Sequence, residues 1–514
     1  MKSRPAHIWC MHINKIEDSK KMTKILFTTS QLEHPPKGGP TLRIENSIKA
    51  LSSVAEVVLV SRLPLQQIGG EQALQYYHKY CSKFLFVTEH NAFVAASRLL
   101  EIARSERVQV LWLGYGNISY EILHHLGLQK CSYPVVIDTD SVWSRFILRG
   151  LSYHDRLEDK IRIFSEGWLK RWEEYWGTQS ADITTAVSSV DAEYYKIFTN
   201  RMDSVQLFSN VIDPENYRGV YENLEIKRPC IYLAGTFWPG SPMEEAAKWI
   251  LEKVLPIVRL SVPNIHFYIV GKSATDVLKF KSNEHVTITG TVQSVLPYLS
   301  NVDVAVVPLK FESGTRFKIM EAGICNIPIV STTLGAEGIP VKDRHDILLA
   351  DTPEGFASCI IELINKPELS RKLVTNCRSL IKRRYSITTA AKEADTILRF
   401  FKHPLFRKVP FLDRGICEIS ERLYRATPNS DLTTMLAFSI ILFNHLMRKY
   451  GNHPLFLPDE EREETAILLK QMKRMMPNNS NVNEALSSIE ATDMQLRNQV
   501  KAISQKSEEA CLSD

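Results

Sequence analysis

Cysteine is sparse and unpatterned in this chain. Nine cysteines are scattered singly through 514 residues, with no C-x-x-C pair and no His/Cys spacing typical of a metal site. Unpaired usage of this kind indicates reduced thiols in a cytosolic protein rather than a disulfide framework. The sequence also lacks any visible metal-ligand cluster, so we expect no bound metal.

Long apolar runs are missing as well. A spanning helix needs about 20 apolar residues, and the nearest run, Met435–Phe443, is about half as long. Residues 1–21 lack the apolar core of a secretory signal, and Met22 is the more natural domain start. We predict a cytoplasmic protein, and peripheral contact with the inner membrane face stays open as an alternative.

Strong charge of one sign is absent too. The net charge is +5 with neutral histidines, which is slight for this length and gives no reason to expect a nucleic-acid partner. Hydrophobic residues make up 44% and charged residues 24%, values typical of a globular protein. A chain this long exceeds one core, so two to three domains are expected.

Residues 302–338 carry the most informative pattern. A β-branched run, Val304–Val307, is followed by a loop with Ser313 and Gly314, a helical pattern over Thr315–Gly323 and a second strand over Ile327–Ser331. A small-residue loop at a helix N-terminus attracts anions, because the backbone N–H groups there are unsatisfied and the helix dipole is positive.

Three charged residues in this helix extend the interpretation. Arg316 and Lys318 add positive charge near the helix N-terminus, and Glu321 places a carboxylate one to two turns further in. Cations can hold a diphosphate while a carboxylate accepts hydrogen bonds from a sugar diol, a combination that suits a nucleotide-sugar. An ordinary buried strand–helix pair is the alternative.

The N-terminal half begins with a similar arrangement. Lys24–Ser30 and Glu56–Ser61 read as strands around a loop that contains Gly38 and Gly39. The glycines permit close backbone approach to a phosphate or sugar, and Arg43 is a candidate to assist. A flexible Pro/Gly loop is the alternative. Because no G-x-G-x-x-G is present here, a dehydrogenase-type dinucleotide site gains little support.

Two carboxylates follow a later strand. Pro134–Ile137 reads as a buried strand, and Asp138 and Asp140 come directly after it, at the edge where parallel sheets bind ligands. Asp140 is our first candidate to orient an acceptor hydroxyl or act as a base, with Asp138 as the alternate. An Asx turn at the strand end is the other reading for each of them.

Tryptophans mark one helix in this half. Trp168, Trp172 and Trp176 repeat every four residues and share one helix face. A helix packed onto the domain is the favoured interpretation, and a membrane-surface helix is the alternative.

The C-terminal half repeats the alternation of strands and helices. A new domain is predicted near Pro229, with strands over Ile231–Ala234 and His266–Val270 and a loop that begins at Gly235. Short turns between alternating strands and helices are typical of a second Rossmann-like domain.

The segment ESGTRFKIMEAGICNIPIVSTTLGAEG resembles the nucleotide-binding segment of glycosyltransferase family 4, the retaining enzymes with the GT-B fold. Lys318, Glu321, Ala322, Pro328 and the Gly335–Gly338 turn match that pattern. The resemblance covers roughly residues 22–402 and also includes ADITTAVSSVDAEYY and the N-x-x-D of the interdomain linker, at Asn210 and Asp213.

The resemblance implies an α/β protein with two Rossmann-like, doubly wound domains facing a cleft. The division it implies is a tail over 1–21, an acceptor domain over 22–220, a nucleotide-sugar domain over 221–402 with a terminal helix crossing back, and a helical appendage over 403–514. Within the appendage, helices are expected over Ile416–Ala426, Asp431–Lys449 and Glu460–Met476, the last with Asp459 as N-cap. The appendage would pack on the transferase or form oligomers.

The implied activity is transfer of a sugar from a nucleotide-diphosphate-sugar to a hydroxyl of a carbohydrate or lipid-linked acceptor. It would proceed with retention and without cofactor or metal, in polysaccharide or glycoconjugate synthesis. Asp140 and Asp138 are the catalytic candidates. The donor-binding candidates are Gly38, Gly39, Gly235, Gly314, Thr315, Arg316, Lys318 and Glu321.

Three positions depart from the family pattern. Ser313 stands where a first glutamate is common, Thr139 stands near the usual histidine, and the loop after Gly235 lacks an arginine and a lysine. A catalytically silent GT-B scaffold and a GT-B sugar-nucleotide epimerase therefore remain as alternatives.

Overall fold

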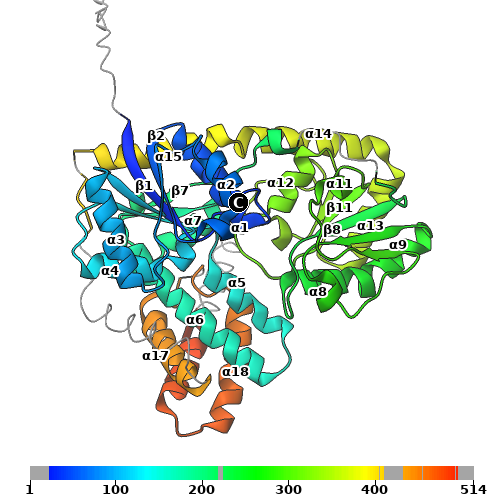
Figure 1. The fold of residues 1–514 in the computed structure, drawn as a ribbon. Helices are drawn as coiled ribbons and strands as arrows, with labels where there is room; N and C mark the ends of the chain where they lie inside the picture. The colour runs from blue at the N-terminus through cyan, green and yellow to red at the C-terminus, as the bar shows by residue number, and fades with distance from the viewer. Residues whose placement is uncertain are drawn as a thin grey trace, which may run out of the picture.

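The computed structural model describes residues 22–217, 224–404, 406–409, 432–453, 455–492 and 494–495. Two α/β bodies lie side by side, and a helical extension leaves the N-terminal body on one side (Figure 1). The predicted tail over 1–21 and the predicted helix over Ile416–Ala426 lie outside the described residues. No helix in the described ranges is both long and apolar enough to cross a membrane.

The N-terminal domain is built on a seven-stranded parallel sheet with the order β3-β2-β1-β4-β5-β6-β7. From β1 the strand order runs to β2 and β3 on one side of the sheet, and from β4 it runs to β7 on the other side. In doubly wound sheets, ligands bind at the carboxyl ends of the two strands where the order reverses, here β1 and β4. The strands are β1 (Thr23–Thr29), β2 (Ala55–Ser61), β3 (Lys83–Phe86), β4 (Val110–Gly114), β5 (Val135–Asp138), β6 (Ile183–Ala186) and β7 (Val205–Leu207).

Helices cover both faces of this sheet, so the central strands are buried almost throughout, as their β-branched and aromatic residues predict. They are α1 (Gly39–Ser52), α2 (Gly70–Tyr77), α3 (Ala92–Ser105), α4 (Tyr120–Leu128), α5 (Trp143–Arg149), α6 (Leu157–Ser180) and α7 (Ser189–Lys196), with short 3-10 turns between them. The α4 segment is preceded by η2 (Gly116–Ile118).

The C-terminal domain has a six-stranded sheet with the order β10-β9-β8-β11-β12-β13, and its reversal lies between β8 and β11. The strands are β8 (Cys230–Ala234), β9 (His266–Val270), β10 (Val286–Ile288), β11 (Val304–Val307), β12 (Ile329–Ser331) and β13 (Leu348–Leu349). The helices are α8 (Pro242–Trp249), α9 (Leu255–Ser261), α10 (Ala274–Val277), α11 (Leu296–Leu299), α12 (Phe317–Ile324), α13 (Pro353–Asn365) and α14 (Pro367–Arg384). The two sheets confirm the predicted fold class.

Some predicted boundaries were wrong. The helix expected over Thr315–Gly323 begins only at Phe317, because Arg316 has extended backbone angles and serves as its N-cap. Further along the chain, α8 and α9 are separated by a π-helical segment, Ile250–Val254. Pro256 follows it, and proline cannot donate the backbone hydrogen bond that a continuous α-helix requires there.

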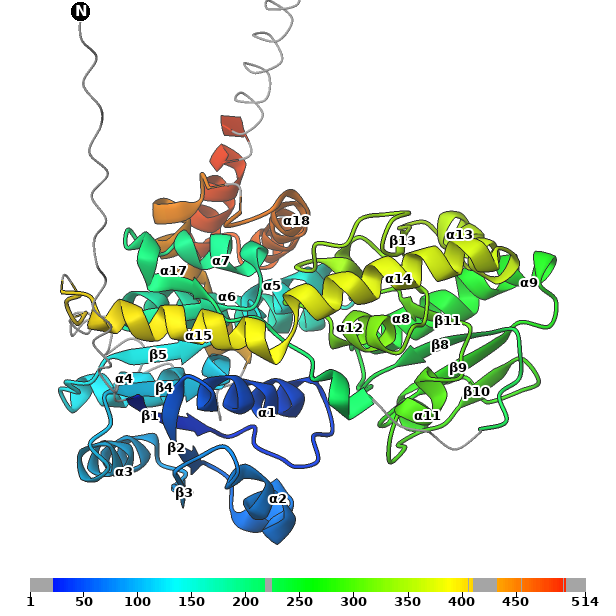
Figure 2. The same ribbon diagram turned by 90° about the horizontal axis from the view of Figure 1, so that it is seen from above.

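The chain crosses between the domains twice. It leaves the N-terminal domain after β7 and returns through α14 and α15 (Ile387–Lys402), which run in succession across both bodies (Figure 2). Apolar residues of α15, among them Ala394 and Ile397, share a core with Ile48 of α1. The Ile212 amide of the first crossing donates to the Tyr385 carbonyl of the second (2.9 Å). The predicted return of the terminal helix is confirmed.

The C-terminal extension packs on the tryptophan face of α6. Helices α17 (Leu432–Tyr450) and α18 (Asp459–Met475) and a helical segment over 480–492 join the core that contains Trp168. The Trp168 ring meets the Phe443 ring edge-on, with centroids 4.6 Å apart. Burial therefore supports the packed reading of this face. The predicted cap was wrong by one residue, because Pro458 is the N-cap and Asp459 begins α18.

Candidate functional site

The loop before α12 contacts the N-terminal domain through a glycine. Gly314 has φ +78°, and a Cβ there would stand 2.7 Å from Ser141 Cβ and 2.9 Å from the Asp140 carbonyl oxygen. Only glycine satisfies both the left-handed backbone and the close contact. The neighbouring Thr315 accepts a hydrogen bond from the Asn210 amide (2.8 Å). The structure therefore brings the predicted donor loop against the segment that holds Asp140.

The N-termini of α1 and α12 also approach each other across this boundary. Gly39 is the first residue of α1, and a Cβ there would lie 3.5 Å from Phe317 Cδ2, at the first residue of α12. Gly38, the N-cap of α1, is exposed and has ordinary extended angles. Two positive helix ends are therefore close together, which favours an anion between the domains.

Two cations near the start of α12 lack acidic partners. Arg316 is buried, and its Nη1 donates to the carbonyl oxygens of Ser313 and Gly314, both at 2.5 Å. The Nε and Nη2 atoms of Arg316 are buried without a hydrogen-bond partner. Lys318 makes no ion pair or hydrogen bond within the described part of the chain. Burial lowers the pKa of both groups, so a bound anion would stabilise their charged forms.

Glu321 lies on the same helix, and one of its carboxylate oxygens accepts a hydrogen bond. The Tyr217 hydroxyl, from the interdomain linker, donates to Glu321 Oε1 (2.9 Å). Burial raises the pKa of Glu321, and the bond from Tyr217 and the charge of Lys318 oppose that rise. The tyrosine hydroxyl already occupies one carboxylate oxygen in the way that a sugar hydroxyl would.

Gly235 lies at the carboxyl end of β8, beside the strand that leads into the Gly314 loop. Its amide donates to the Val270 carbonyl (3.0 Å), and a Cβ on Gly271 would stand 1.8 Å from the Gly235 carbonyl oxygen. The two glycines allow the ends of β8 and β9 to meet. Because β8 and β11 are parallel neighbours, Gly235 and the Gly314 loop share one sheet edge.

Asp138 and Arg43 form a buried ion pair inside the N-terminal domain. Arg43 Nη2 donates to Asp138 Oδ1 (2.5 Å), and Nη1 donates to the Asn210 side chain (2.7 Å). Both side chains are buried, and the Thr185 hydroxyl also donates to Asp138 Oδ1 (2.8 Å). The suggestion that Arg43 assists a phosphate was therefore wrong, since its charge is used inside the domain. Asp138 has the same structural role here.

Asp140 is half-buried at the domain boundary and lies near two aromatic side chains. Trp143 Nε1 donates to Asp140 Oδ1 (3.0 Å), and the Tyr115 hydroxyl lies near enough to the carboxyl group to lower its pKa. Burial raises the pKa of Asp140 to about 6, against the opposing effect of Arg43 and these donors. A carboxyl group with such a pKa is suited to proton transfer near neutral pH.

The ion pairs that join the domains could not be recognised from the sequence. Arg149 of α5 donates to both carboxylate oxygens of Glu337, at 2.8 and 2.9 Å, and to the Glu312 carbonyl. Arg145 adds a contact of 3.3 Å to the same carboxylate. Glu337 sits in the glycine turn of the motif, but pairing over such a sequence distance can be recognised only in the fold.

Ser313 and Thr139, which replace the family's usual glutamate and histidine, both donate hydrogen bonds to main-chain carbonyls. The Ser313 hydroxyl donates to the Val142 carbonyl (2.7 Å), across the domain boundary. The Thr139 hydroxyl donates to the Thr185 carbonyl (2.6 Å), inside the N-terminal sheet. Among the described residues, no group of three or more His, Cys, Asp or Glu is placed to hold a metal ion. The absence of a metal in the reaction stays a prediction.

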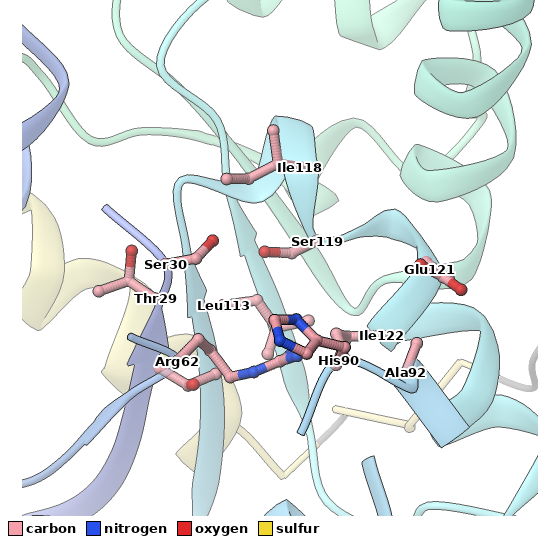
Figure 3. A pocket seen from close by; sticks show the side chains of 11 residues that line it. Thr29, Ser30, Arg62, His90, Ala92, Leu113, Ile118, Ser119, Glu121 and Ile122 are labelled. Carbon is pink, nitrogen blue, oxygen red and sulfur yellow. The ribbon is translucent and has the colours of Figure 1, made fainter. Parts of the chain in front are cut away.

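A pocket of about 90 Å³ opens at the carboxyl edge of the N-terminal sheet (Figure 3). Sequence reasoning missed it, because its residues come from five separate segments. It is lined by Thr28, Thr29, Ser30, Arg62, His90, Ala92, Leu113, Ile118, Ser119, Glu121 and Ile122.

Sequence comparison finds a family match within the C-terminal domain. Residues 228–366 match the family model of glycosyl transferases group 1. A search of curated proteins finds no match. The family match contains Gly235 and the whole α12 loop.

Structure comparison extends over most of the chain. HepE of Anabaena in complex with UDP-glucose aligns with TM-score 0.52 and 12% identity over 73% of this chain and 99% of its own. A glycosyltransferase from Rickettsia africae gives 0.52 and 11%, over 74% and 99%. Sucrose-phosphate synthase from Thermosynechococcus elongatus gives 0.53 and 14%, over 73% and 98%. The chain thus has the GT-B fold, and its C-terminal domain matches glycosyl transferases group 1.

Proposed function

We propose that this protein is a glycosyltransferase that moves a sugar from a nucleotide-diphosphate-sugar to an acceptor hydroxyl, with retention and without a metal ion. The observation that carries the proposal is that Arg316 and Lys318, at the N-terminus of α12, have no acidic partner. This end of α12 faces the N-terminus of α1. The family match over 228–366 and the UDP-glucose bound by HepE support it.

On this proposal the diphosphate lies between the two helix ends. Arg316, Lys318 and the backbone N–H groups near Gly314 and Thr315 stabilise the charge that develops on the leaving diphosphate. Gly38, Gly39 and Gly235 let main chain approach the ligand closely. Glu321 accepts hydrogen bonds from the ribose in place of the Tyr217 hydroxyl.

The acceptor hydroxyl reaches the donor from the N-terminal domain. Asp140 orients that hydroxyl or takes up its proton, because its raised pKa matches the working range of a base. Contacts between α5 and the motif loops bring the domains together, which excludes water and favours transfer over hydrolysis. Carbohydrate and lipid-linked acceptors both fit the proposal, as do peripheral membrane contact and association through the C-terminal helices.

A donor-binding module without turnover is the second candidate. It is favoured by Ser313 and Thr139, which replace the family's usual glutamate and histidine. Both hydroxyls donate to main-chain carbonyls and so are used for structure. In that case the donor would bind, but no sugar would be transferred.

Calorimetry with UDP-glucose, ADP-glucose and GDP-mannose, followed by transfer assays, tests the proposal. Lys318→Ala should weaken binding of the best donor by roughly 1.5–3 kcal/mol, because a charged contact is lost. Lys372→Ala, an exposed lysine on α14, is the matched control and should leave affinity unchanged. Equal donor affinity in wild type and Lys318→Ala would refute the site, and binding without turnover would favour the second candidate.

A further inference from the structure

The pocket in the N-terminal domain lies at the reversal point of its sheet. Thr29 ends β1, Ser30 follows it, and Leu113 belongs to β4; the strand order of the sheet reverses between these two strands. Ligands bind in this crevice in doubly wound sheets. The pocket is separate from Arg316 and Lys318, which belong to the C-terminal domain.

Arg62 places a positive charge in the wall of this pocket. Its amide donates to the Thr29 carbonyl (2.9 Å), which fixes the residue beside the end of β1. Its Nε and Nη2 donate to the carbonyl oxygens of Val87 and Glu89, both at 3.1 Å. These bonds fix the guanidinium but supply no negative charge, and within the described ranges Arg62 has no ion pair.

Three other enclosed arginines have a carboxylate partner, which Arg62 lacks within the described ranges. Arg43 pairs with Asp138, Arg149 with Glu337 and Arg171 with Glu461. A half-buried guanidinium that lines a pocket and has no carboxylate partner is free to pair with an anionic ligand. Burial accordingly lowers the pKa of Arg62, although the charges of Glu89 and Glu121 oppose that effect.

The rest of the wall offers hydrogen-bond donors and one acid. The hydroxyls of Ser30 and Ser119 point toward each other, and the His90 ring lines the same pocket as Arg62 (Figure 3). Glu121 is the carboxylate of the lining; it makes no ion pair with Arg62, and burial raises its pKa. A small anion with several oxygens would match one cation and several neutral donors.

The pocket is also connected to Asp140. Ile118 and Ser119 of its wall follow Asn117, whose side chain accepts from the Asp140 amide (3.0 Å) and donates to the Ser141 carbonyl (2.8 Å). The same loop carries Tyr115, whose pKa is raised by burial and by the nearby Asp140 carboxyl group. A ligand in the pocket therefore contacts the loop that holds the candidate base.

We propose that this pocket binds an anionic group, a phosphate or a carboxylate, carried by the acceptor sugar, and that Arg62 is its specificity-determining residue. The inference rests on the proposed function, because it assigns the pocket to the acceptor of that reaction. The acceptor is thus an anionic sugar, held at Arg62 so that a hydroxyl of the same molecule is directed toward Asp140.

Calorimetry on the full chain saturated with UDP tests this inference, with glucose 6-phosphate, glucuronate, glucose and inorganic phosphate as probes. At least one anionic sugar should bind at least about tenfold more tightly than glucose, and Arg62→Gln should remove that advantage. Arg62→Lys should retain part of it. Inorganic phosphate should compete with the anionic sugar.

Arg201→Gln is the matched control. Arg201 is likewise half-buried, has no acidic partner and donates to three main-chain carbonyls, but it is not part of the pocket. Its substitution should leave the binding of all four probes unchanged.

Three results would overturn the inference: equal affinities for glucose and the anionic sugars, unchanged anion binding in a folded Arg62→Gln protein, or binding of inorganic phosphate alone. Failure of UDP itself to bind would count against the proposed function instead. The probes would then be titrated without UDP.

Discussion

Arg149 and Glu337 form a two-fold hydrogen-bonded ion pair between the domains, with N–O distances of 2.8 and 2.9 Å. The pair is largely enclosed, and Arg145 contacts the same carboxylate. It joins α5, which follows Asp140, to the glycine turn of the nucleotide-sugar motif. Glu337 therefore links the candidate acceptor side of the site to the candidate donor side.

Glu337→Gln should loosen this link. Loss of the charge leaves two arginines facing a neutral amide, and we expect the closed arrangement to lose about 1–3 kcal/mol. Small-angle X-ray scattering should show a larger radius of gyration without ligand than for wild type. Glu354→Gln, in the first turn of α13, is a control remote from the boundary. Identical scattering of Glu337→Gln and wild type would show that the pair does not hold the domains.

The same contact should depend on pH in one direction. Burial raises the pKa of Glu337, but Arg149 and Arg145 outweigh that effect, and the net pKa lies below its ordinary value. A carboxylate with a lowered pKa contributes its stabilisation above its unfolded pKa of about 4.3 and loses it as pH falls further. Scattering at stepwise lower pH should show opening only below that value, and Glu337→Gln should lack this transition.

Asp140 should appear in the pH profile of the reaction. If its carboxylate orients or deprotonates the acceptor, kcat/KM should rise with pH through an apparent pKa of about 6. Asp140→Asn should lower kcat by about 10²-fold or more and abolish this limb. A profile that keeps the limb in Asp140→Asn would assign the proton transfer to another group.

Gly314→Ala should damage the donor loop more than a backbone effect alone explains. The new Cβ meets Asp140 and Ser141 in addition to the strained φ, so a loss of about 2–4 kcal/mol in donor affinity or stability is expected. Gly70→Ala is the matched control, since Gly70 also has a positive φ, +66°, but open space around it. Calorimetry with UDP and thermal melting would measure both, and equal effects would refute the packing argument.

Glu461→Ala should release the C-terminal extension. Arg171 donates to Glu461 (3.0 Å), and both side chains are buried between α6 and α18. Removal of one partner leaves an uncompensated buried charge, which costs about 3–5 kcal/mol. Hydrogen exchange should then accelerate in α18 first. Glu463→Ala, on the same helix, should leave exchange in α18 at the wild-type rate.

The strands and the motif loop could be predicted because their signals are local. Runs such as Val304–Val307 are apolar on both faces, and the Ser313–Gly314 turn precedes a helical pattern. The roles of Arg43 and Arg62 could not be predicted in this way. Each depends on partners that only the sheet order brings together: Asp138 lies 95 positions from Arg43, and Val87 lies 25 positions from Arg62.

The hydrogen bond from Ile212 to Tyr385 has a mechanical consequence. The chain passes between the domains at two places, and this bond fixes the two passages to each other at one point. The bond favours rotation of the domains about that point over sliding of one domain past the other. Each closure would then bring the Gly314 loop back toward the same contact with Asp140, so successive substrates would meet a similar alignment of the two halves.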